Sequence, residues 1–207
     1  MSTEEFPVLV SKARQIAVQS LIGIALLIAG VVCALAQDAH SQMPALHQEL
    51  ATEQKSQANA LLKTVRDTTE RFKDVSVAEA EGYALQFGCV SGPDSGVLGL
   101  HDVNGAIVSR GELDPTRPRT VIYEPATNGG LKLIGADFLI FADVWAKKNP
   151  GPPELMGQFF HYWESPNHFG LPEFYTLHVW TWKDNPNRAF VNWHPSVSCQ
   201  EFGSQAR

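Results

Sequence analysis

The chain has 207 residues and a formal net charge of -6, from 22 acidic and 16 basic residues. The basic residues form no stripe along the sequence, so nucleic acid is excluded as an expected partner. This length fits one domain with an N-terminal extension, and it is sufficient to bury a sizeable core.

Residues 1–36 have the pattern of a signal peptide. Lys12 and Arg14 precede an uninterrupted apolar run that ends in the small-residue site Ala34-Leu35-Ala36. We therefore predict cleavage after Ala36 and export to the periplasm or the extracellular space. The alternative is an uncleaved membrane anchor, because the apolar stretch counted from Ile16 approaches the ~20 residues that span a bilayer. Membrane contact would then be limited to this segment.

Residues 37–82 are predicted to be a helical N-terminal segment. Within them, residues 45–73 contain no glycine or proline and are rich in strong helix formers. Apolar side chains at helical spacing predict the face that docks against the body: Leu61, Leu62, Val65 and Phe72. A second, short helix is predicted from Val77 to Glu81, with Ser76 as its capping residue and Gly82 as its end.

Residues 83–207 are predicted to be a β-rich domain, because short β-branched and aromatic runs alternate with glycine- and proline-containing turns. The runs predicted as strands are residues 83–89, 96–103, 120–123, 131–141, 157–163 and 174–182. Many short strands with regular turns are typical of an antiparallel β-barrel or sandwich. The predicted fold class is therefore mainly β, α+β overall, with an N-terminal helix.

Two cysteines, Cys89 and Cys199, remain after removal of the predicted signal peptide. An even pair in an exported chain favours a disulfide, and this one would close almost the whole β domain. The alternative is a pair of buried free thiols.

Four predicted strands each carry a ligand-type side chain on an apolar face. For example, alternation places His101 on one face with Val97 and Val103. An ionised carboxylate on a leucine-rich face is costly unless it is paired or binds a metal. The four residues are His101, Asp137, His161 and His178. Three imidazoles and one carboxylate suit zinc, copper, iron or nickel, so we predict a transition-metal site.

Several alternatives stay open at this point. Each histidine could be a hydrogen-bonded core residue, and a register slip of one residue would reverse its face. Trp163 and Trp180 could instead form the ligand-binding floor of a metal-free secreted module that holds a sugar or a small apolar ligand. Glu124 and Asp137 could form the carboxylate pair of a hydrolase. His168 and His194, in proline-flanked turns, are predicted to lie on the surface.

The ligand set is similar to that of cupins, which gather histidine and acidic ligands from barrel strands, although no His-x-His pair occurs here. The β domain also resembles a group of exported bacterial proteins of uncharacterised function, through the segments CVSGP, GLHDVN, ELDPTRP, VIYEP, GQFFH and FYTLHVWTWKDNP. That resemblance implies export and the pairing of Cys89 with Cys199, and it transfers no activity. The predicted function is an exported transition-metal-binding protein that, if it is an enzyme, acts on a small molecule.

Overall fold

The computed structural model describes residues 48–92 and 95–202. The predicted signal peptide and its cleavage site lie outside these residues. The chain divides into two compact units, Met1–Glu53 and Gln54–Arg207. In the first unit, the described residues 48–53 are exposed and helical. Among the described residues, no helix is both long enough and apolar enough to cross a membrane.

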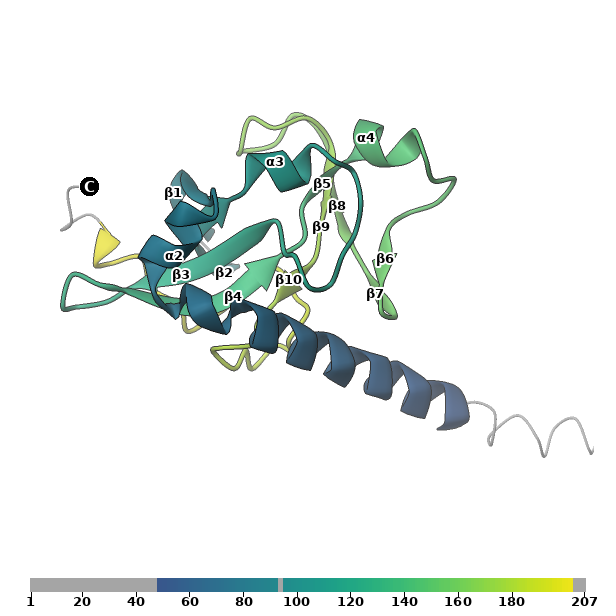
Figure 1. Ribbon diagram of the computed structural model, residues 1–207, viewed down its shortest axis with the longest axis horizontal. Helices are drawn as coiled ribbons and strands as arrows, with labels where there is room; N and C mark the ends of the chain where they lie inside the picture. Colours follow the sequence, from purple (N-terminus) through teal and green to yellow (C-terminus); the bar gives the residue numbers. More distant parts are fainter. Residues whose placement is uncertain (1–47, 93–94, 203–207) are drawn as a thin grey trace, which may run out of the picture. The chain divides into compact units, whose positions relative to one another are not determined.

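A five-stranded antiparallel sheet, curled into a half-barrel, forms the centre of the second unit (Figure 1). Each strand pairs antiparallel with its neighbour. The strands, in spatial order, are β1 (Ala84–Gly92), β2 (Gly96–Val103), β3 (Thr120–Pro125), β4 (Leu131–Asp137) and β10 (His178–Val179). The predicted fold class, a mainly β and overall α+β protein with an N-terminal helix, is confirmed.

Smaller elements flank this sheet. A second sheet has the order β5 (Ile140–Phe141), β9 (Phe174–Thr176) and β8 (His161–Trp163), and β6 (Glu154–Leu155) pairs with β7 (Gln158–Phe159). The short helices are η1 (Glu70–Lys73), α2 (Val75–Ala80), α3 (Gly105–Val108) and α4 (Ala142–Ala146).

Three of the predicted strands are each divided in two by the structure. The predicted strand 131–141 becomes β4 and β5, because the chain leaves the main sheet after Asp137 and pairs with β9 from Ile140 onward. The run 174–182 likewise supplies β9 to the small sheet and β10 to the main one. Such corners let one strand-like run serve two sheets.

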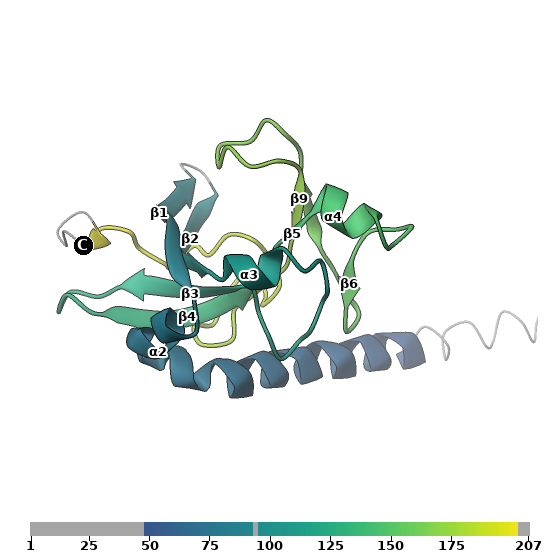
Figure 2. The ribbon, with the colours of Figure 1, turned by 45° about the horizontal axis from the view of Figure 1, so that its top comes forward.

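The N-terminal helix continues to residue 69 and is followed by η1. Leu61 and Val65 are fully buried and belong to the same core cluster as Phe138 of the body. Figure 2 shows the helix of the second unit running alongside β4. Phe72 is also buried and Leu62 is half-buried against the same cluster as Leu61, so the predicted docking face is confirmed.

Helix α2 begins two residues earlier than the sequence predicted. The capping residue is Asp74, whose side chain accepts a hydrogen bond from the Ser76 amide at 3.1 Å. The predicted cap, Ser76, therefore lies inside the helix. Gly82 follows the helix with a φ of 90°, a conformation that glycine adopts without strain.

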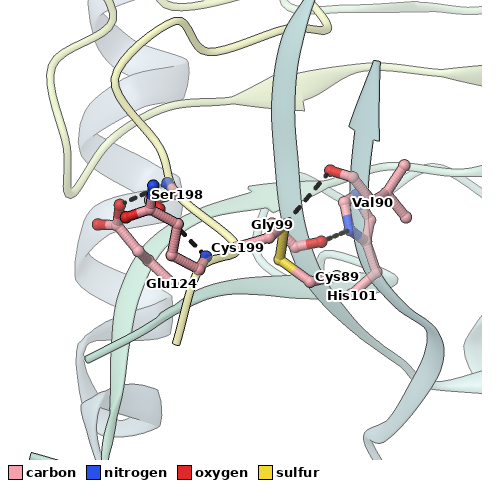
Figure 3. Close-up of a disulfide and its surroundings, with 8 residues drawn as sticks. Cys89, Val90, Gly99, His101, Glu124, Ser198 and Cys199 are labelled. Atoms are coloured by element: carbon pink, nitrogen blue, oxygen red, sulfur yellow. Dashed lines mark hydrogen bonds between the residues drawn. A yellow bond between two sulfur atoms is a disulfide. The ribbon is translucent and has the colours of Figure 1, made fainter. Parts of the chain in front are cut away.

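A disulfide joins Cys89 of β1 to Cys199 in the C-terminal segment, as the sequence predicted. Figure 3 shows it beside β2, the strand that carries His101, and Cys89 pairs across the strands with Leu100. A disulfide over a separation of 110 residues indicates an oxidising compartment.

Candidate metal centre

Three of the four predicted ligands come together on one face of the curled sheet. His101 lies on β2, Asp137 on the last residue of β4, and His178 on the first residue of β10. Each offers one ligand atom, and these atoms lie within 4.8 Å of one another. All three side chains are buried. Two imidazoles and one carboxylate at this spacing could hold a metal ion.

The curl of the sheet is what brings the two histidines together. Three strand spacings separate β2 from β10, which would amount to about 14 Å in a flat sheet. The measured distance between His101 Nε2 and His178 Nε2 is 3.2 Å. The strands that lie between them must therefore bend.

Two glycines allow this bend because no side chain could be accommodated at either position. Gly99 has a φ of 83°, and a Cβ there would lie 2.7 Å from the Tyr123 carbonyl oxygen. A Cβ on Gly135 would lie 2.8 Å from the Val179 carbonyl oxygen. Both glycines thus let neighbouring backbones approach closely, as expected where a sheet curves.

The distance between the histidines fits a shared metal ion. Two imidazole nitrogens, each ~2.05 Å from a tetrahedral ion, lie about 3.3 Å apart, and the observed separation is 3.2 Å. The same distance also fits a hydrogen bond in which one neutral imidazole donates to the other. Geometry alone is consistent with both arrangements.

Asp137 is held in place by two hydrogen bonds to one of its carboxylate oxygens. Thr176 donates its hydroxyl to Oδ1 at 2.5 Å, and the Leu177 amide donates to the same atom at 3.1 Å. Asp137 is also the direct cross-strand partner of His178, whose Nδ1 lies 3.9 Å from Oδ1. Burial raises the pKa of Asp137, and the Thr176 hydroxyl opposes that shift.

Both histidines favour the neutral form. Burial, together with the smaller effect of the neighbouring His178, lowers the pKa of His101 to about 4. Burial likewise lowers the pKa of His178 to about 3, and the neighbouring Asn192 side chain opposes this shift. Neutral imidazoles have a free lone pair, so a metal would not compete with a proton for them near neutral pH.

The second nitrogen of each imidazole has a different environment. His101 Nδ1 lies 3.4 Å from the carbonyl oxygen of Gly99, which is the usual kind of outer partner for a metal-binding histidine (Figure 3). His178 Nδ1 is buried and makes no hydrogen bond to any described residue. One of the two rings therefore has the expected outer partner.

A small pocket of about 30 Å³ adjoins the three residues. Apart from them and Thr176, its lining is apolar. Trp163, predicted to bind ligand, lies in this lining. Trp180 does not; it is buried, it stacks on the His178 ring with centroids 5.7 Å apart, and its indole N–H donates to the Val191 carbonyl oxygen at 2.6 Å.

His161 lies outside the group of three. It is exposed on β8, the edge strand of the small sheet, and its Nε2 lies 3.3 Å from the Phe190 carbonyl oxygen. In its strand run it is Phe160 that is buried, while Phe159 is exposed, so the apolar face assumed from alternation does not point into the core.

Of the other two histidines of the β domain, one has the predicted exposure and the other does not. His168 is exposed, as expected. His194, predicted to lie on the surface, is fully buried, and that prediction is wrong. Its backbone pairs with Val97 and its ring meets Trp180 edge-on at 5.0 Å, so a turn-like segment is drawn into the core by long-range pairing.

The carboxylate pair considered for a hydrolase is not supported. Across β3 and β4, Glu124 faces Lys132 while Asp137 faces Thr120. Four residues along a strand span about 13 Å, which exceeds the roughly 6.5–9.5 Å between glycosidase carboxylates. Both carboxylate oxygens of Glu124 instead accept hydrogen bonds from Lys183 at 2.8 Å.

Sequence reasoning missed Thr176 as a supporting residue, although a signal was present. Thr176 stands two residues before His178, the spacing that puts both on one face of a strand.

No protein-family model, curated protein or solved structure matches this chain. The site itself is therefore the basis for any functional conclusion.

Proposed function

We propose that this is an exported protein that binds a transition metal through His101, Asp137 and His178. The observation that carries the proposal is the convergence of three buried ligand-type side chains within 4.8 Å. A buried carboxylate needs a compensating partner, and a cation held by two neutral imidazoles would supply one. The disulfide and the N-terminal sequence pattern support export to the periplasm or the extracellular space.

The ligand set favours zinc or iron, and copper is proposed as a third metal that it could bind. Two histidines with one carboxylate are typical of catalytic zinc sites and of non-haem iron sites. Three protein ligands leave at least one coordination position for water or substrate. When bound, such an ion would polarise a substrate or activate water or dioxygen, which is the basis for proposing a metalloenzyme that acts on a small molecule.

The chain's own residues would set up that chemistry. Thr176 and the Leu177 amide hold Asp137 Oδ1, which fixes the direction of the carboxylate. Gly99 holds the His101 ring through its carbonyl oxygen. The apolar pocket beside them limits access of water to the centre.

Metal analysis of protein purified without an affinity tag from an exporting host tests the proposal. We expect about one transition-metal ion per chain, and its loss in His101→Ala and His178→Ala. His168→Ala is the matched control, because this histidine is exposed in the same domain. Absence of stoichiometric metal after reloading with zinc, iron and copper would overturn the proposal.

A metal-free binding module is the second candidate. It is favoured by the 3.2 Å contact between the two Nε2 atoms, which a single N–H donor could bridge without an ion. The metal analysis separates the two candidates, because only the first requires an ion.

A further inference from the structure

We infer that the pocket beside the three residues binds a small, largely apolar molecule, whose one polar atom faces His101, Asp137 and His178, with Phe87 as the gate. This inference rests on the proposed function, because it assigns the molecule on which the metal centre would act. It concerns the chemical class of the ligand and its route of access.

The lining of the pocket sets the chemical class. Its wall is built from aliphatic and aromatic side chains, among them Leu98, Leu139, Trp163, Leu171 and Phe174. A sugar would leave most of its hydroxyl groups without partners against such a wall, and each buried, unpaired hydroxyl is costly. An apolar ring or chain would instead gain from the contact.

The polar residues are confined to one group within the lining. His101, Asp137, Thr176 and His178 are its only polar members. Thr176 is already engaged by Asp137, whereas His178 Nδ1 is buried without a hydrogen bond among the described residues. A ligand with one polar atom could therefore satisfy this group and leave the rest of its surface apolar.

The size of the pocket requires a moving part. About 30 Å³ is enough for roughly one or two water molecules. Anything as large as an aromatic ring must displace a side chain. Of the lining residues, Phe87 is the one assigned to this movement, because the residue is 48% exposed.

The backbone at Phe87 supports its role as the gate. Its φ of 64° lies in the left-handed region, which is unusual for a bulky residue. It stands in an interruption of the β1–β2 register between Gln86 and Cys89, next to Gly88, which also has a positive φ. The Phe87 ring meets the Phe169 ring edge-on at 5.8 Å. Such local strain is retained where the placement of a side chain is useful.

Calorimetric titration with phenol, toluene and glucose tests the inference, in both metal-free and zinc-loaded protein. We expect phenol and toluene to bind and glucose not to bind. Zinc should strengthen the binding of phenol, which has a polar atom, and leave that of toluene unchanged. Leu171 is a half-buried residue of the lining, so a tryptophan at this position would fill the pocket. Leu171→Trp should therefore lower the affinity for phenol and for toluene at least tenfold, which corresponds to about 1.4 kcal/mol.

Two further variants test the gate and the location. Phe87→Ala should speed the association of toluene severalfold, measured by stopped-flow quenching of tryptophan fluorescence. Phe159→Ala is the control, because this exposed phenylalanine lies outside the lining and should change nothing. An unchanged association rate of toluene in Phe87→Ala would refute the role of Phe87 as the gate.

The outcomes distinguish the two proposals. Toluene binding without any metal binding would refute the metal centre and retain the apolar pocket. Metal binding with no affinity for phenol or toluene would refute the pocket and retain the centre. Binding of glucose in place of the aromatic probes would overturn the assignment of ligand class.

Discussion

His101 and His178 stand 77 positions apart in the chain, yet their Nε2 atoms lie 3.2 Å from each other. They belong to strands that are separated by β3 and β4 in the sheet. Their contact is therefore a measure of how strongly the sheet curls. Any change that flattens β3 or β4 should separate the two rings before it disturbs either ring locally.

The first prediction concerns Gly99. Gly99→Ala would place a Cβ 2.7 Å from the Tyr123 carbonyl oxygen, at a φ of 83°. We expect a loss of about 1–3 kcal/mol in unfolding free energy, together with weaker zinc binding, measured by urea titration and by calorimetry. Gly129→Ala is the matched control, because its φ is 81° but no atom lies within 4 Å of the added Cβ. Equal losses in the two variants would show that backbone strain, and not the collision, is responsible.

The second prediction concerns pH and applies to metal-free protein. The folded pKa values of His101 and His178, about 4 and about 3, lie below the ordinary value of 6.5. Below pH 6.5 the unfolded chain therefore binds protons that the folded protein excludes. Each histidine should lower the unfolding free energy by about 1.4 kcal/mol per pH unit as the pH falls from about 6.5 toward its folded pKa.

Asp137 should offset part of this loss at the acidic end. Its pKa is raised in the folded protein, so the folded state takes up that proton first and gains stability as the pH falls through the raised value. Urea titrations in the presence of a chelator measure the sum. His101→Gln should make the slope shallower, and a slope unchanged from wild type would contradict the assignment of a buried neutral imidazole.

The third prediction concerns η1, which follows the N-terminal helix. Phe72 is buried against the body, and the backbone carbonyl oxygen of Phe72 accepts a hydrogen bond from the Tyr123 hydroxyl at 2.7 Å. Phe72→Ala should cost about 3–5 kcal/mol in unfolding free energy. Phe159→Ala is the matched control; this residue is 67% exposed, so the change should be less than about 0.5 kcal/mol. A near-zero effect for Phe72→Ala would mean that η1 contributes little to the fold.

The fourth prediction concerns the disulfide. Replacing both cysteines by serine should lower the unfolding free energy, by up to about 4.7 kcal/mol for a loop of this length. Non-reducing peptide mapping should recover Cys89 linked to Cys199, as in the structure. Free thiol at both positions in freshly isolated protein would contradict this.

Sequence patterns could predict the parts of the candidate site that depend on one strand at a time. Alternation alone put His101, Asp137 and His178 on buried faces, because the period of a strand is a local property. That these residues converge was a hypothesis that alternation could not test, because convergence depends on the curl that Gly99 and Gly135 permit.

Two histidines show where local reasoning fails. His161 lies among aromatic residues in the sequence, which is typical of a core residue, but its strand is the edge of a separate small sheet. His194 has the neighbours of a turn, but pairing with Val97 buries it. In both cases a contact with a distant segment decides the exposure, and nothing within a few residues reveals it.

The bond between Cys89 and Cys199 also limits what a single proteolytic cut can do. It closes the backbone between two cysteines 110 positions apart into a covalent ring that contains β2, β3, β4 and β10. A protease that cuts an exposed turn within that ring, such as the one around Asn187, opens the ring without releasing a fragment. The nicked chain would keep His101, Asp137 and His178 in one covalently connected molecule. A single cut would therefore leave the three residues of the candidate site together.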